Sequence, residues 1–301
     1  MKFLCITVVC VLFSLSGFSQ NIPEGMENRK IKRYIPIEHI REKGLILTKQ
    51  DSLNFHFRDR DTLVLVSPAL EFHFPEGIRV QIKPQDSLFI EKYKETVYGP
   101  RTRRDRNKQS LKIWRNGIRL YFDPSVPKRH QKELLKFAED LDSRVDSLTI
   151  SKVRKREDAN YLVFYRNSDE DFDLDPRISD KRSGYYLNWS KNKDITRGSL
   201  KINTYAYEDK EAVLKDLKMR FFETLGYFKY AGKLPCGSLL SACRGEKELS
   251  EEDLEILKYH YSYQNCYGIG LKAFEAQHEH RRQRFAEYPY IMMYVSHPIE
   301  Q

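Results

Sequence analysis

Hydrophobic and polar residues alternate in several short stretches of the first third of the chain. The alternation is clearest at residues 53–57 and 78–82, and it is typical of strands with one buried face. Shorter strand patterns lie at residues 62–66 and 72–74, with prolines and glycine between them. This pattern, which continues to Tyr98, predicts a small β-rich domain. Together with a polar leader, the domain occupies residues 20–100.

Beyond residue 108, strand patterns alternate with amphipathic helices. The strand patterns lie at residues 117–122, 160–165, 184–189 and 199–205. A first helix carries apolar residues at every third or fourth position from Leu134 to Leu148, which gives it one buried face. A second helix is predicted from Asp209 to Leu225. We expect it to end at Gly226, because glycine suits the left-handed cap of a helix.

The last third of the chain is predicted to be helical. Ser250 and Asp253 have the spacing of a capping box and mark the start of one helix. A further helical pattern covers residues 271–284, where His278 and His280 are expected on a solvated face. Residues 109–301 therefore read as one α+β domain with a C-terminal helical tail.

Composition narrows the class of protein. The chain has 301 residues, which suggests about two domains. Charged residues make up 32% of it and the mean hydropathy is −0.65, which excludes a polytopic membrane protein. Aromatic residues at 13% argue against wholesale disorder. The formal net charge of +9 permits an anionic partner without requiring one.

The first 19 residues have the features of a signal peptide. A lysine at position 2 precedes an apolar run at residues 3–13, and Gly17 and Ser19 place small residues before a cleavage site at Gln20. The apolar run is shorter than the roughly 20 residues that span a bilayer. We therefore expect an exported protein, periplasmic or extracellular, with no transmembrane segment after cleavage.

Three cysteines remain after that cleavage, namely Cys236, Cys243 and Cys266. An oxidising compartment favours their pairing, so we expect one disulfide. Both the Cys236 to Cys243 pair and the Cys243 to Cys266 pair are compatible with the spacing. The cysteines have no zinc-binding spacing and no histidine nearby, so we expect no metal at them.

A basic segment at residues 101–108 separates the two predicted domains. Its cations are Arg101, Arg103, Arg104, Arg106 and Lys108. We interpret the segment as a solvated linker, with a contact to phosphate or sulfate groups of a polyanion as the alternative. Nucleic acid is not an expected partner, because no aromatic residue is interleaved for base stacking and the chain is exported.

The order of elements in the second domain resembles that of the metzincin-type zincins. It is more similar to a bacterial metzincin-like family of unknown function, whose members often lack the zinc-binding histidines. The resemblance covers roughly residues 108–270 and rests on residues 111–118, 222–227 and 249–269. It implies a zincin-like mixed sheet with an active-site-type helix and a C-terminal helix.

The zinc motif of that fold can be tested on this sequence. A zincin helix carries His-Glu-x-x-His, because residues i and i+4 share a face and both imidazoles reach one metal. Alignment on Leu225-Gly226 places the first ligand, the base, the second ligand and the third ligand on Met219, Arg220, Glu223 and Lys229. Of these, only the Glu223 carboxylate could bind zinc. No histidine lies between His130 and His260 that could restore the pair, so we expect neither a metal nor a cofactor.

These observations favour a pseudo-peptidase that acts as a binding module for an unknown protein, peptide or glycan of the cell envelope. Glu223 is expected to form an ion pair with Arg220 or Lys229. One alternative is a zinc-independent hydrolase that uses Glu223 with Asp216 or Glu208, and another is an envelope polyanion binder. Several tyrosines would lie near the cleft of the parent fold: Tyr185, Tyr186, Tyr205, Tyr207, Tyr227, Tyr230, Tyr259, Tyr261, Tyr263 and Tyr267.

Overall fold

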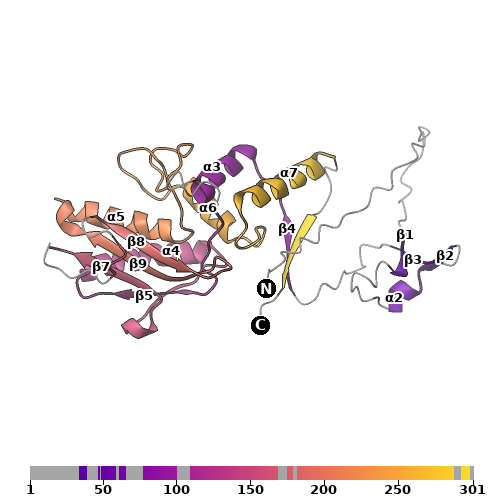
Figure 1. Cartoon of the computed structure of the whole chain (residues 1–301), viewed down its shortest axis with the longest axis horizontal. Coiled ribbons are helices and arrows are strands. Elements are labelled where there is room, and N and C mark those ends of the chain that lie inside the picture. The colour runs from indigo at the N-terminus through magenta and orange to yellow at the C-terminus, as the bar shows by residue number, and fades with distance from the viewer. Residues whose placement is uncertain are drawn as a thin grey trace. The chain divides into compact units, whose positions relative to one another are not determined.

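The computed structural model describes two compact units of the chain (Figure 1). The described residues are 34–38, 47, 49–58, 61–65, 77–99, 109–168, 175–178, 182–287 and 293–298. One unit comprises the chain up to Ile82 together with the residues from Met293 onwards, and the other runs from Lys83 to Met292. The predicted signal peptide (1–19), the strand at 72–74 and the basic segment (101–108) lie outside the described residues.

The first unit contains a small antiparallel sheet in the order β1-β3-β2. Its elements are β1 (Tyr34–Pro36), α2 (Lys49–Ser52), β2 (Phe55–Arg58) and β3 (Asp61–Leu65). Val64 is fully buried, with Ile37, Leu47 and Phe55 packed around it. The strands expected at residues 53–57 and 62–66 are therefore confirmed, with bounds that differ by one or two residues.

A second, two-stranded sheet in this unit joins distant parts of the chain. Strand β4 (Gly77–Ile82) pairs antiparallel with β10 (Met293–Pro298), so that Val80 lies opposite Val295. The sequence predicted β4 but assigned the whole C-terminal segment to the α+β domain. Strand β10 itself was not predicted, because the strand that pairs with it lies more than 200 positions earlier in the chain.

Residues 87–98 form a helix, which corrects the prediction of strands as far as Tyr98. Helix α3 (Ser87–Tyr98) is capped by Asp86, whose side chain accepts a hydrogen bond from the Phe89 N–H at 2.9 Å. Tyr93 and Val97 are buried one turn apart in the core of the second unit. The sequence contained two signals of this helix that the prediction did not use, namely the capping residue Asp86 and the spacing of four between Tyr93 and Val97.

The second unit is built on a five-stranded mixed sheet in the order β6-β5-β7-β9-β8. Its strands are β5 (Ile118–Phe122), β6 (Ile150–Lys152), β7 (Tyr161–Arg166), β8 (Gly184–Trp189) and β9 (Ile195–Asn203). Strands β6, β5, β7 and β9 run parallel, whereas β8 pairs antiparallel with β9 at one edge. The predicted mixed sheet and the α+β class are confirmed.

Two long helices share one core with this sheet (Figure 1). They are α4 (Lys128–Arg144) and α5 (Lys210–Thr224), and both contribute apolar side chains to it. The core includes Leu134, Ala138 and Leu141 of α4, Leu217 and Phe221 of α5, and Leu120, Val163 and Leu200 of the strands. The predicted apolar stripe of the first helix therefore faces the sheet.

Two further helices complete the second unit. Helix α6 (Glu251–Tyr261) begins with the predicted capping box, in which the Ser250 hydroxyl accepts from the Asp253 N–H at 3.1 Å. Helix α7 (Leu271–Glu287) confirms the predicted C-terminal helix. None of the helices in the described parts of the chain combines the length and the apolar character that a membrane crossing requires.

A buried histidine fastens three segments together. His260 of α6 contacts the Lys112 carbonyl oxygen through Nε2 at 2.8 Å and the Tyr93 hydroxyl through Nδ1 at 3.0 Å. The carbonyl can only accept, so Nε2 carries the proton and Nδ1 accepts from Tyr93. Burial lowers the pKa of His260 to about 4. The neutral imidazole therefore joins α3, α6 and the segment before β5.

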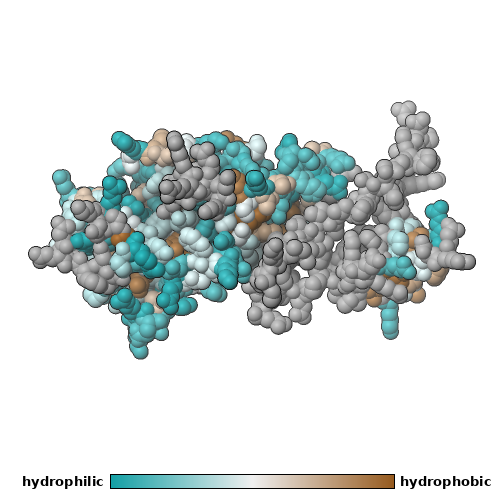
Figure 2. Space-filling view, viewed as in Figure 1, coloured by the Kyte–Doolittle hydropathy of each residue, from teal (hydrophilic) through white to brown (hydrophobic). Residues whose placement is uncertain are grey.

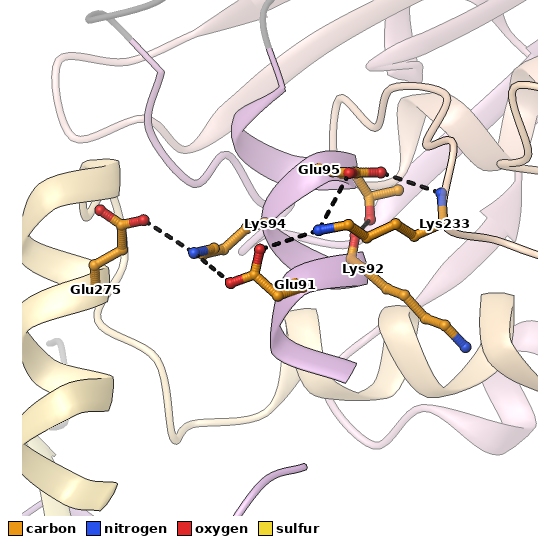
Figure 3. Close-up of polar contacts among 7 residues, drawn as sticks. Glu91, Lys92, Lys94, Glu95, Lys233 and Glu275 are labelled. Atoms are coloured by element: carbon orange, nitrogen blue, oxygen red, sulfur yellow. Dashed lines mark hydrogen bonds and ion pairs between the residues drawn. The ribbon is translucent and has the colours of Figure 1, made fainter. Parts of the chain in front are cut away.

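Ion pairs on the surface also connect α3 to its neighbours. Figure 3 shows Lys94 of α3 between Glu91 and Glu275, at 2.6 and 3.0 Å, so that α3 is tied to α7. Lys233, in the loop after α5, pairs with Glu91 at 3.2 Å and Glu95 at 3.5 Å. These groups are solvated, so the pairs contribute little to stability and their contribution weakens as salt rises.

Helix α7 does not present both of its histidines to solvent, as the sequence analysis expected. Hydrophilic side chains dominate the visible surface over α7 (Figure 2), and His280 is among the exposed residues of the helix. His278 instead turns inward, with Nε2 2.7 Å from the Tyr259 hydroxyl and its ring against Phe274. Burial lowers the pKa of His278 to about 4. One histidine of the pair is therefore structural.

Candidate functional site

Helix α5 positions most of the residues aligned with a zinc site. The Asp209 side chain caps the helix by accepting from the Glu211 N–H at 3.0 Å, as the predicted start requires. Met219, Arg220 and Glu223 follow within the last two turns, and Lys229 lies in the turn after the helix. The helix expected from the sequence is present. The chemistry available at this site therefore depends on the contacts of these four side chains.

The turn after α5 is built differently from the prediction. Gly226 was expected to adopt the left-handed conformation, but the residue with positive φ is Tyr227, at 54°. Gly226 is required for another reason. A Cβ there would lie 2.4 Å from ring carbons of Phe228 and 2.8 Å from His260 Nε2. The glycine therefore permits close packing of α5 against the following chain and α6.

Arg220, which aligns with the general base, forms an ion pair with another residue of α5. Its Nε lies 2.9 Å from the carboxylate of Asp216, one turn earlier. Burial opposes the charge of Arg220, but attraction to Asp216 and their hydrogen bond outweigh it and raise the guanidinium pKa. Arg220 cannot take a proton from water, and Asp216 is committed to an ion pair.

Glu223, at the position of the second ligand, is 5% exposed. Its carboxylate accepts a hydrogen bond from the Tyr230 hydroxyl, and that hydroxyl also lies 3.8 Å from the Met219 sulfur. Glu223 attracts Arg220 electrostatically as well. The sequence analysis anticipated the attraction to Arg220 but not the bond from Tyr230, which a loop brings back over the helix.

A lysine closes this cluster on the outside. The Lys247 ammonium lies 4.4 Å from the centroid of the Tyr230 ring and donates to the Ser241 carbonyl oxygen. Burial lowers the pKa of Lys247, while attraction to Glu223 opposes that effect. Asp216, Arg220, Glu223, Tyr230 and Lys247 thus form a cluster of mixed charge on one side of α5, here called the α5 cluster.

Lys229, at the position of the third ligand, is buried and points toward α3. Its ammonium donates to the Val97 carbonyl oxygen at 2.7 Å and lies 4.8 Å from the Tyr227 ring centroid. All four residues that the sequence alignment compares with a zinc site therefore have contacts inside the protein. Within the described residues, no group of three or more histidine, cysteine, aspartate or glutamate side chains could hold a metal ion.

An aromatic group lies beside the end of α5. Tyr185 and Trp189 of the edge strand β8 contact the Tyr227 ring, with centroid distances of 6.4 and 5.2 Å. The Lys112 ammonium lies 4.8 Å from Trp189, and 38% of the Trp189 surface is exposed. The sequence analysis singled out Tyr185 and Tyr227 but missed Trp189 and Lys112. Alternation along β8, which puts Tyr185 and Trp189 on one face, could have found Trp189.

Other candidates are distributed over the second unit. Tyr259 and Tyr261 are core residues, so they do not line a surface as the grouping of tyrosines suggested. Glu208 is exposed before α5, one residue ahead of the helix cap. A disulfide joins Cys236 to Cys243, with Cα atoms 5.0 Å apart, and this is one of the two pairings that the spacing left open. Cys266 is buried and its sulfur accepts from the Gln277 amide.

Comparison with known proteins adds no family to this description. The chain matches no protein-family model, and no curated protein is found to be related to it. The architecture and the site therefore define a mixed α+β protein whose long helix ends in a cluster of paired charges beside an aromatic group.

Proposed function

We propose that this protein is an exported, non-catalytic, zincin-like protein that acts as a binding module in the cell envelope. The proposal rests on the internal contacts made by the residues that align with a zinc site. Arg220 is paired with Asp216, Glu223 accepts from Tyr230, and Lys229 donates to a backbone carbonyl. The mixed sheet, the helix that ends at Leu225-Gly226 and the capped α6 also agree with the resemblance.

The binding surface we assign to it is the aromatic group of Tyr185, Trp189 and Tyr227. Aromatic rings with a polar handle suit the recognition of peptides or glycans, because each combines an apolar face with hydrogen-bonding groups. Trp189 is the most accessible of the three, with 38% of its surface exposed, whereas Tyr185 and Tyr227 are partly buried. The ammonium of Lys112, which is 5% exposed and donates to the Ser110 carbonyl oxygen at 3.2 Å, contacts the Trp189 ring from within the protein.

The non-catalytic part of the proposal is tested by metal content and peptidase activity. Protein purified without chelator should contain less than about a tenth of an equivalent of zinc, and it should not cleave generic peptides. Structural zinc sites bind with free energies of about 10–16 kcal/mol, so a functional site would retain its metal through purification. Near one equivalent of zinc together with chelator-sensitive cleavage would overturn the proposal.

The binding part is tested with arrays of envelope glycans and of peptides. We expect wild-type protein to retain a subset of ligands and the Trp189→Ala variant to lose at least about tenfold in affinity for them, as truncated aromatic hot spots do. Tyr205→Ala is the matched control, because Tyr205 is also an exposed aromatic residue but lies outside the aromatic group. Equal losses in both variants would contradict this surface.

A second candidate, a zinc-independent hydrolase, is favoured by one observation. Asp216 and Glu223 are two largely buried carboxyl groups seven residues apart on one side of α5, and both face Arg220. If a hydrolytic activity is found, Glu223→Gln should abolish it while leaving the unfolding midpoint nearly unchanged. Retention of that activity in the variant would remove Glu223 from the mechanism.

A further inference from the structure

A cavity of about 560 Å³ opens at the other side of the sheet, where β5 and β6 end. The two strands are parallel, with Leu120 opposite Lys152, so their carboxyl ends meet at one edge. The first turn of α4 borders the same space. Crevices outside the carboxyl ends of parallel strands are frequent ligand sites, and the volume is in the range of small-molecule pockets.

The cavity is lined by cations without a carboxylate. Lys128, Lys152 and Arg154 line it, and none of the described lining residues is acidic. All three cations are exposed, and within the described residues Lys128 and Arg154 form no ion pair. This differs from the α3 surface, where Lys94 and Lys233 both have glutamate partners. Three positive charges are therefore concentrated around one hollow with no internal counter-charge.

One of these cations is positioned by neutral groups. The Lys152 ammonium donates to the Gln131 side-chain oxygen at 3.2 Å and lies 5.5 Å from the Phe122 ring centroid. Gln131 is itself 5% exposed and donates to the Val126 carbonyl oxygen at 2.9 Å. An amide and an aromatic face hold the ammonium in place without cancelling its charge, so it remains free to attract an anion.

The backbone at this point adds to the positive potential. Helix α4 has 17 residues, and its N-cap is Pro127, which offers no side-chain oxygen to the first N–H groups. The positive end of the helix dipole therefore favours an anion on the same side as the three cations. Half-exposed Tyr121 gives the cavity an aromatic wall beside these charges.

We propose that this cavity binds a phosphate or sulfate ester. The side chains of Lys128, Lys152 and Arg154 would contact its oxyanion. The organic part of the ester, such as a sugar, would pack on Tyr121. Guanidinium and ammonium groups together suit a tetrahedral oxyanion, because each supplies charged donors. The ester can come from a free phosphorylated small molecule or from a charged envelope glycan, since both present the same group.

The test is calorimetric titration of the full mature chain with four probes: inorganic phosphate, glucose 6-phosphate, glucose, and a sulfated heparin oligosaccharide. We expect an anionic probe to bind and uncharged glucose to give no signal. Binding should weaken as salt rises, since exposed charges are screened. Preference for glucose 6-phosphate would indicate a small ester, and preference for the oligosaccharide would indicate a glycan. If no anion binds at about 10 mM, the proposal is wrong.

Two triple variants test whether the anion binds in this cavity, and each removes three positive charges. Lys128→Gln/Lys152→Gln/Arg154→Gln should weaken the binding at least about tenfold, because several charged hydrogen bonds are lost together. Lys132→Gln/Lys136→Gln/Lys191→Gln removes three exposed cations from outside the cavity and should change affinity less than about twofold. Equal weakening in both variants, or unchanged oligosaccharide binding in the first, would overturn the proposal and direct attention to residues 101–108.

Discussion

The Ser238 hydroxyl donates to the Asp253 carboxylate across 2.6 Å, and both residues are fully buried. The same carboxylate accepts from the backbone N–H groups of Leu239, Leu240 and Ser250 at 2.8 to 3.1 Å. One side chain at the start of α6 therefore holds the disulfide-closed loop 236–243 in place. The capping box predicted for α6 has this second role, which local sequence could not indicate.

Replacement of Asp253 should be among the most destabilising changes in the chain. Asp253→Ala leaves several buried donors without an acceptor, so we expect the free energy of unfolding to fall by about 3 kcal/mol or more. Urea denaturation followed by circular dichroism measures it. Glu252→Gln, one residue earlier in the same first turn, should change stability by less than about 1 kcal/mol. A loss below about 1 kcal/mol for Asp253→Ala would contradict this role.

The disulfide should contribute less than Asp253 does. Cys236 and Cys243 are seven residues apart, and closing so short a loop removes little entropy from the unfolded chain. Cys236→Ser/Cys243→Ser should lower the free energy of unfolding by about 2 kcal/mol without loss of fold. Denaturation midpoints of the two proteins give the difference. Complete unfolding of the double variant would mean that the bond, not Asp253, organises the loop.

Gly226 should tolerate no side chain. A methyl group there would overlap the Phe228 ring and approach His260, so Gly226→Ala should cost about 1–3 kcal/mol of stability. Gly232 is the matched control, because a Cβ at that position meets no atom within 4 Å. Thermal unfolding of both variants distinguishes packing from a general effect of replacing glycine. Similar melting temperatures for the two would argue against the close packing described here.

Acid should destabilise the protein through its buried histidines. Unfolded histidine titrates near pH 6.5, whereas burial holds the pKa of His260 at about 4. The unfolded state therefore binds more protons between these values. The contribution of His260 is complete above pH 6.5 and is lost as pH falls toward 4, by an amount on the order of 3 kcal/mol.

The measurement is the slope of unfolding free energy against pH between 6.5 and 4. It should be shallower in His260→Gln than in wild-type protein, whatever the absolute stability of the variant. His280→Gln is the control, because His280 is exposed on α7 and should leave the slope unchanged. If His260→Gln and wild-type protein have the same slope, the acid sensitivity has another source.

Local patterns were sufficient for most of the second unit. The apolar stripe from Leu134 to Leu148, the helical pattern from Asp209 to Leu225 and the capping box at Ser250 each predicted the correct element. Helix α3 shows how such a prediction fails. Its cap at Asp86 was present in the sequence, but the strand patterns before it were extended over a segment with helical spacing.

Three features of the protein depend on its tertiary structure. Residues 293–298 become a strand because β4 offers them a partner, and His278 turns inward because Tyr259 and Phe274 lie beside α7. Tyr230 reaches Glu223 only because a loop returns over α5. The sequence by itself determined the mixed α+β class, the helix that carries the aligned positions and the types of residue at those positions. Which side chains meet depends on how the chain folds back on itself, and the periodicity of a single helix or strand does not contain that information.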